Sequence, residues 1–160
     1  NYLNDFSFYT KEDKIFRYTR DILLGENKYF EIMNSMMKKS KVSLNTKLHK
    51  KLWMSTIELQ KLKNDGHIIG LHSHTHPTKM SEKSYKFQYS NYQENKLILE
   101  NIINENIITM SHPCNSYNSY TLEILKKLDI KLGFRANLVE GYNSEYEIPR
   151  IDHSEILKLL

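Results

Sequence analysis

The chain has 160 residues, of which 39% are hydrophobic and 26% charged, a composition typical of one globular domain and not of a disordered or fibrous protein. The formal net charge is +4, but Lys and Arg alternate with Asp and Glu along the chain. We therefore interpret the charges as solvated surface and not as a nucleic-acid site. Cys114 is the single cysteine, which excludes an intrachain disulfide.

Membrane and secretion signals are not found in the sequence. No apolar run approaches the roughly 20 residues of a membrane span, and the opening residues NYLND are polar, unlike a signal peptide. These features favour a cytoplasmic location. The first 50 residues contain one predicted helix, from Phe16 to Met37, whose apolar residues recur at helical spacing.

From Ser55 onward, predicted helices alternate with short apolar strands. Ser55 and Glu58 form a capping box that begins a helix, and Asn64-Asp65-Gly66 ends it. Further helices are predicted over 85–104 and from 118 or 119 onward, and strands over 68–72, 107–110 and 132–135. This alternation is typical of βαβ units in an α/β fold with a parallel sheet or barrel.

Three histidines lie within five residues, His72 at the end of the predicted strand 68–72 and His74 and His76 in the loop after it. The carboxyl ends of strands are where α/β folds place their chemistry. Neutral imidazole is the commonest protein metal ligand, and three clustered imidazoles would repel one another if protonated. We therefore favour a metal site over a structural role. The spacing differs from the His-Glu-x-x-His zinc helix, and a single cysteine argues against four-ligand structural zinc.

The run GHIIGLHSHTHP, residues 66–77, resembles the second motif of the polysaccharide deacetylases with the NodB homology domain, in which His-Ser/Thr-x-x-His supplies two metal ligands. The run SHPCNSYN, residues 111–118, is similar to the third motif of that family, and the TLEIL and KLGF segments that follow it fit as well. The resemblance covers residues 53–151. It implies a single domain over 1–160 that folds as a distorted (β/α) barrel, incomplete at its N-terminal strand, with 1–52 as a family-specific insertion.

The resemblance implies a hydrolase that removes an N- or O-acetyl group from a carbohydrate, such as a bacterial surface glycan or its precursor. His72 and His76 would bind a divalent metal, usually zinc, which activates the attacking water. The backbone N–H of Cys114 would help to stabilise the oxyanion. The residues implied to contact the substrate are His74, His112, Pro113 and Tyr117. For His112, a structural role in the loop is the alternative.

Departures from the family pattern leave a second function open. The Asp-Asp-Gly motif, which supplies the family's base and third ligand, is not found upstream of His72, and we interpret the nearest match, Asn4-Asp5, as an ordinary strand or loop acid. Near the end of the chain, Arg150 and Asp152 are expected to approach the histidines as catalytic residues, unless this segment is a surface turn. The alternative function is a noncatalytic metal- or sugar-binding module that keeps the fold and lacks the base. The sequence does not predict an oligomeric state.

Overall fold

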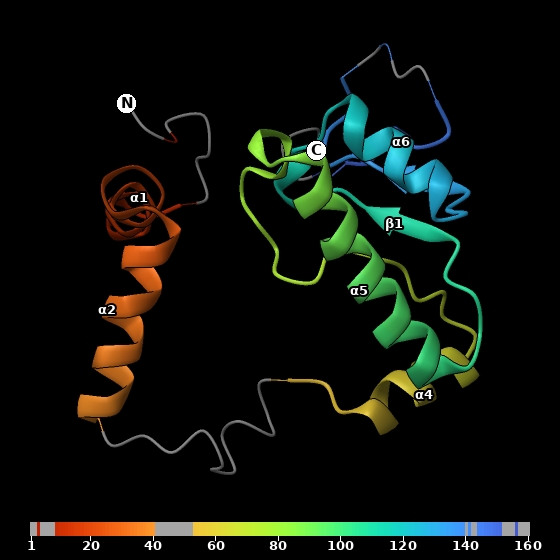
Figure 1. The fold of residues 1–160 in the computed structure, drawn as a ribbon, viewed down its shortest axis with the longest axis horizontal. Coiled ribbons are helices and arrows are strands. Elements are labelled where there is room, and N and C mark those ends of the chain that lie inside the picture. Colours follow the sequence, from red (N-terminus) through yellow and green to blue (C-terminus); the bar gives the residue numbers. More distant parts are fainter. Residues whose placement is uncertain are drawn as a thin grey trace. The chain divides into compact units, whose positions relative to one another are not determined.

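The computed structural model describes residues 3, 9–40, 53–139, 141, 144–151 and 156. Its contacts divide the chain into two compact units, Asn1–Trp53 and Met54–Leu160 (Figure 1). The predicted single domain over 1–160, with an insertion at 1–52, stays a prediction. In the described part of the chain, no helix is both long enough and apolar enough to cross a membrane.

The first unit is a run of helical segments. These are α1 (Lys11–Tyr18), the π-helical η1 (Thr19–Leu24) and α2 (Gly25–Ser40). Thr10 and Asp13 begin α1 with a reciprocal capping box. Most of the residues predicted as one helix, from Phe16 to Met37, are helical, but the single helix is wrong: a π-helical stretch and Gly25, whose φ of 69° is not helical, divide it.

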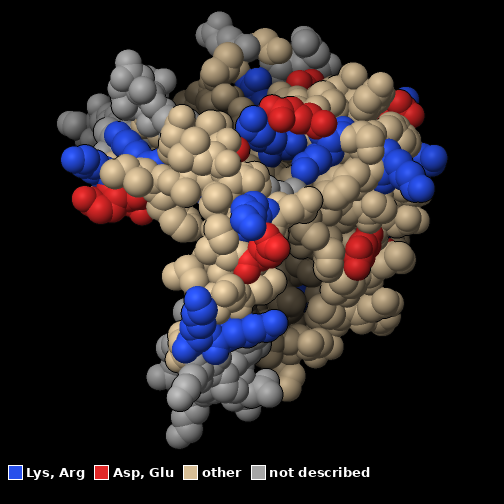
Figure 2. Space-filling view, turned by 60° about the vertical axis from the view of Figure 1, so that its left-hand side comes forward, with Lys and Arg blue, Asp and Glu red and all other residues tan. Residues whose placement is uncertain are grey.

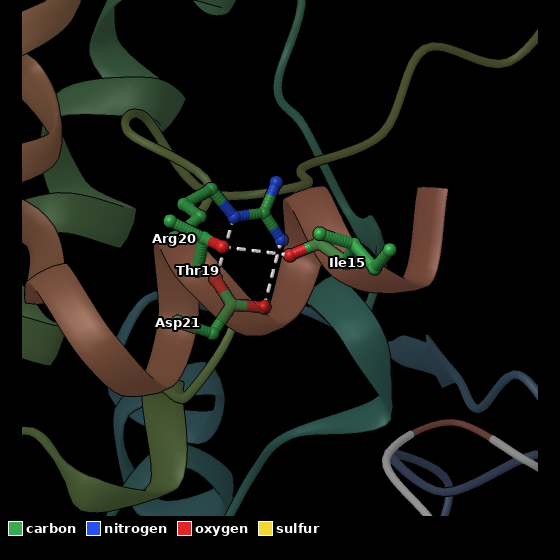
Figure 3. Close-up of polar contacts among 4 residues, drawn as sticks. All are labelled: Ile15, Thr19, Arg20 and Asp21. Carbon is green, nitrogen blue, oxygen red and sulfur yellow. Dashed lines mark hydrogen bonds and ion pairs between the residues drawn. The ribbon is translucent and has the colours of Figure 1, made fainter. Parts of the chain in front are cut away.

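The π-helical turn interrupts the run just after α1. Figure 3 shows the junction, where the Thr19 hydroxyl donates a 2.9 Å hydrogen bond to the Ile15 carbonyl and the Arg20 guanidinium pairs with the Asp21 carboxylate at 2.5 Å. A Thr hydroxyl that bonds the carbonyl four residues earlier competes with regular helix hydrogen bonding. Periodicity alone predicts one helix here because it does not report such local competition.

The second unit contains the predicted alternation of helices and strands. Its elements in chain order are α4 (Thr56–Asn64), η2 (Met80–Glu82), α5 (Tyr85–Ile103), β1 (Thr109–Ser111), η3 (Pro113–Asn115), α6 (Ser119–Lys127) and β2 (Leu132–Phe134). The capping box of Ser55 and Glu58 is present, and Asn118 caps α6 in the same way. The three predicted helices of this unit are confirmed.

Parallel pairing joins β1 and β2, with Thr109 opposite Leu132. Single parallel bridges extend the arrangement on both sides, from Leu71 to β1 and from β2 to Ile148. The strand predicted over 68–72 is therefore reduced to one bridge. Leu71 makes both of its backbone hydrogen bonds with β1. Pairing does not continue beyond it because Ser73, the next residue whose backbone would face β1, is left-handed with φ of 65°.

The strand predicted over 107–110 lies at Thr109–Ser111. It begins later because the N–H of Ile107 donates to the Glu100 carboxylate at 2.9 Å and is not part of the sheet. The parallel α/β organisation expected from the sequence is confirmed over these segments.

Helices α5 and α6 pack on one face of this sheet, beside β1 in Figure 1. Leu71 and Met110 point into that layer and contact a core that includes Tyr92, Ile124 and Leu125, all at most 1% exposed. Each such side chain contributes about 1.5–3 kcal/mol when it is buried. The opposite face of the sheet is not covered by these helices, and it lines the pocket described below.

Candidate functional site

His72 and His76 converge at the carboxyl end of the sheet. Their Nε2 atoms are 3.1 Å apart and their ring centroids 4.8 Å apart. The Nδ1 atom of His72 lies 2.8 Å from the carbonyl oxygen of Ser111. Because a carbonyl oxygen only accepts, Nδ1 carries the proton and Nε2 of His72 presents its lone pair toward His76. The spacing of the two residues predicts this convergence of the rings.

The loop between the two histidines turns sharply through left-handed backbone. Ser73 has φ of 65° and His76 has φ of 51°, conformations that cost about 1–3 kcal/mol each in residues other than glycine. The Ser73 hydroxyl accepts a 3.0 Å hydrogen bond from the N–H of His76. This turn returns the chain so that residues four apart present their rings to the same point.

The two ring nitrogens fit a divalent cation. Nitrogens bound to one tetrahedral Zn²⁺ at about 2.0–2.1 Å lie about 3.3 Å apart, close to the 3.1 Å found between His72 and His76. Within the residues that the structure describes, no third His, Cys, Asp or Glu joins this pair. The pair therefore offers two imidazole ligands, which suit zinc.

The lowered pKa of His72 favours metal binding. Partial burial lowers the pKa of His72 below its usual 6.5, an effect larger than the opposing hydrogen bond to Ser111. Electrostatic repulsion from His76 and from the Arg150 guanidinium lowers the pKa of His72 further. The His72 ring is therefore neutral at neutral pH, as a ligand must be.

A pocket of about 530 Å³ lies against the uncovered face of the sheet. Its polar end is formed by His72, Ser111 and Arg150, and its other walls are the residues Ile68, Gly70, Leu71, Thr109, Met110, Leu132 and Phe134. The Arg150 Nη1 atom lies 3.5 Å from the Ser111 hydroxyl. Arg150 thus approaches the histidine pair, as its position in the sequence predicts. Asp152 lies outside the described residues.

His112 lies beneath Tyr117 in the loop after β1. The His112 side chain is 1% exposed, and its ring stacks on that of Tyr117 with centroids 4.1 Å apart. Its Nε2 donates a 2.7 Å hydrogen bond to the Tyr146 carbonyl, and burial lowers its pKa. Nδ1 is buried without a hydrogen-bond partner among the described residues. The substrate contacts proposed for His112 and Tyr117 stay predictions.

The remaining predicted site residues lie in the same two loops. Pro113 is buried, and Cys114 is exposed with φ of 51°. His74 lies at the centre of the first loop, where its Nε2 pairs with the Glu94 carboxylate at 3.4 Å. The roles predicted for these three residues are not tested by their positions.

Two asparagines of α5 bond the histidine loop, and sequence analysis missed both. Asn91 bonds the backbone of His74 and Thr75, and Asn95 bonds that of His72. In the sequence, they are two polar residues four apart on a helix. That pattern is ordinary on a solvated helix face, so it gave no signal.

Charges outside this site are mixed. Lys and Arg lie among Asp and Glu over much of the face shown in Figure 2. This distribution agrees with the interpretation of the charges as solvated surface.

Comparison with known families identifies the chain. A model of the family described as polysaccharide deacetylase matches residues 25–133, more than half of the sequence. The chain belongs to the polysaccharide deacetylase family. The family model begins at residue 25. The resemblance in motifs begins only at Trp53. A comparison with curated proteins gives no match.

Solved structures show the deacetylase fold in this chain. The Streptococcus pyogenes deacetylase PplD, solved in complex with acetate, is 24% identical with a TM-score of 0.57, over 77% of this chain and 58% of that chain. The BpsB deacetylase domain from Bordetella bronchiseptica is 10% identical with a TM-score of 0.53, over 62% of this chain and 51% of that chain. A de-N-acetylase from Aggregatibacter actinomycetemcomitans is 9% identical with a TM-score of 0.55, over 85% of this chain and 72% of that chain. The chain thus spans just over half the length of the first two structures.

Proposed function

We propose that this protein is a metal-dependent deacetylase that hydrolyses an N- or O-acetyl group of a carbohydrate, such as a bacterial surface glycan or its precursor. The observation that carries the proposal is the convergence of the His72 and His76 Nε2 atoms, 3.1 Å apart, in a chain of the polysaccharide deacetylase family. Two imidazole nitrogens that meet at the carboxyl end of a parallel sheet lie where α/β enzymes place their chemistry.

We further infer that the four parallel segments at Leu71, β1, β2 and Ile148 are part of a distorted (β/α) barrel. Support comes from their parallel pairing and from the helices that cover a single face. In such a barrel, the uncovered face, with its pocket, is the interior. Loops at the strand ends would then surround the histidine pair.

His72 and His76 would hold the cation, and the chemistry of the two nitrogen donors suits zinc. When bound, such an ion lowers the pKa of water to about 7 and stabilises negative charge on a carbonyl oxygen. The Ser111 carbonyl holds the His72 ring in the tautomer that leaves Nε2 available. The lowered pKa of His72 keeps that nitrogen free of a proton.

Arg150 would supply positive charge beside the reacting acetyl group. It lines the polar end of the pocket together with His72 and Ser111, and a guanidinium there can donate hydrogen bonds to a carbonyl oxygen as negative charge develops on it. The backbone N–H of Cys114 is proposed as a second donor, and Asp152 as the general base. The proposed substrate contacts are His74, His112, Pro113 and Tyr117.

Acetate release tests the proposal. The protein is freed of metal with a chelator, supplied with Zn²⁺, and incubated with an oligomer of N-acetylglucosamine. We expect acetate release that requires Zn²⁺ and is lost in His72→Ala and His76→Ala. Zn²⁺ binding without acetate release from N- or O-acetylated oligomers would contradict the enzymatic proposal and favour the noncatalytic alternative.

A further inference from the structure

We propose that Asn91 and Asn95 of α5 are positioning residues that hold His72 and His76 in the geometry required to bind a cation. The inference rests on the proposed function, because it assigns the supports of that same site. It goes beyond the two ligands to residues of another element. The evidence is the set of hydrogen bonds between α5 and the histidine loop.

Asn91 bonds the middle of the loop at three points. Its Oδ1 accepts from the backbone N–H of His74 at 2.8 Å and of Thr75 at 3.4 Å. Its Nδ2 donates to the Thr75 hydroxyl at 2.8 Å. Because backbone N–H groups only donate, the amide has one orientation that satisfies the loop. Asn91 is 6% exposed, so water does not readily replace these bonds.

Asn95 bonds the start of the loop. It lies four residues after Asn91 and so faces the same side of α5. Its Oδ1 accepts from the N–H of His72 at 3.1 Å. The N–H of His72 points away from β1, so Asn95 attaches this residue to α5 on the edge opposite the pairing of Leu71 with β1. The first ligand is therefore fixed from two sides, by Asn95 on its backbone and by Ser111 on its ring.

The loop needs this external support because its backbone is strained. Ser73 and His76 are both left-handed, and such conformations persist only where the surroundings determine them. The bond from His76 to the Ser73 hydroxyl is local, so it moves with the loop. The asparagines, in contrast, join three N–H groups of the loop to a packed helix. Without them, the turn can relax and the two rings can separate.

A second buried amide on α5 provides a matched control. Gln88 is 0% exposed and lies about one turn before Asn91. Its amide donates to the Lys83 carbonyl at 2.9 Å and accepts from the Thr121 hydroxyl at 2.6 Å. These bonds reach Lys83, directly after η2, and α6, but not the histidine loop. Loss of Gln88 should therefore destabilise the fold without moving the ligands.

The test is Zn²⁺ affinity, measured by isothermal titration calorimetry on the whole protein. Changes to groups that orient metal ligands typically weaken affinity about 10–100-fold, and we expect a loss in this range for Asn91→Leu. We expect a smaller loss for Asn95→Ala, which removes one hydrogen bond. Gln88→Leu should lower the unfolding midpoint yet keep the wild-type affinity within about twofold. Asn91→Asp keeps the oxygens that accept from the loop, so it should bind Zn²⁺ at least as tightly as the wild type.

Each outcome decides the inference. Equal Zn²⁺ affinity in Asn91→Leu, Gln88→Leu and the wild type would overturn the positioning role and leave the proposed function intact. If Asn91→Leu does not fold, Asn95→Ala and Asn91→Asp decide in its place. Wild-type Zn²⁺ affinity in Asn95→Ala together with weakened Zn²⁺ affinity in Asn91→Asp would overturn it. Failure of the wild type to bind Zn²⁺ would contradict the proposed function itself and this inference with it.

Discussion

The backbone carbonyl of Ser111 accepts a 2.8 Å hydrogen bond from Nδ1 of His72, and this bond determines which nitrogen of His72 faces His76. β1 thereby sets the tautomer of a residue in the adjacent segment. The consequences of this arrangement can be measured in the pH dependence of the protein.

Stability should fall as the pH is lowered below about 6.5. The pKa of His72 and that of His112 lie below the usual 6.5, in both cases first because of burial. Between these lowered values and 6.5, the unfolded chain binds more protons than the folded one. The free energy of unfolding therefore rises with pH up to about 6.5. The stability that the two neutral imidazoles contribute is lost as the pH falls from 6.5 toward their lowered pKa values. Urea unfolding from about pH 5 to about pH 7 measures the effect, which should be smaller in His112→Asn. A profile identical in the variant and the wild type would remove His112 as a cause.

Replacement of Arg150 by Lys should lower turnover more than stability. Arg150 is exposed, and its Nη1 lies near Ser111 beside the histidine pair. Lys keeps the charge but not the planar two-pronged donor. We expect turnover to fall by roughly 10–100-fold, less than the roughly 100–1,000-fold loss when an oxyanion donor is removed altogether, with little change in the unfolding midpoint. Lys126→Gln, at an exposed position of α6, is the control. Unchanged acetate release in Arg150→Lys would return this segment to a surface role.

Addition of a methyl group at Gly133 should destabilise the fold strongly. A Cβ at this position would overlap the carbonyl oxygen of Tyr146 and lie 2.8 Å from its Cα, so backbone must move. We expect a cost of about 1–3 kcal/mol. At Gly70, the added Cβ would first meet the end of the Thr109 side chain, at 2.7 Å, which is easier to displace. Chemical denaturation of Gly133→Ala and Gly70→Ala measures the free energy of unfolding of each variant. A larger loss of stability in Gly70→Ala would contradict this comparison.

Tyr117→Phe should destabilise the fold less than Tyr117→Ala. It removes the 3.0 Å hydrogen bond from the Tyr117 hydroxyl to the Glu147 carboxylate and keeps the ring that stacks on His112. A hydrogen bond of this kind contributes about 0.5–3 kcal/mol, with the higher values for charged acceptors. Tyr117→Ala also removes the stacked ring and should cost more. If both variants unfold at the same temperature, the stack does not stabilise the loop.

Local signals predicted much of the second unit. The bond between Ser55 and Glu58 spans three residues, as does that between Asn118 and Thr121, so each helix start can be recognised in the sequence. The left-handed Asn104 ends α5 at the predicted boundary. The convergence of His72 and His76 was also predicted, because both ligands belong to one short loop.

Long-range contacts account for what the sequence did not predict. Asn95 is 23 residues from His72, and nothing in the sequence predicts the hydrogen bond between them. The hydrogen bond of the buried His112 ring likewise goes to the carbonyl of Tyr146, 34 residues away. Such partners depend on how α5 and the closing segment pack against the sheet, and residue spacing carries no information about that packing.

Imidazole ¹⁵N NMR during a Zn²⁺ titration tests the metal centre most directly. The proposed site predicts that the Nε2 resonances of both His72 and His76 shift together and are complete at one equivalent, while Nδ1 of His72 keeps the proton it donates to Ser111. Shifts confined to other histidines, or binding of Zn²⁺ through Nδ1 of His72, would contradict the account.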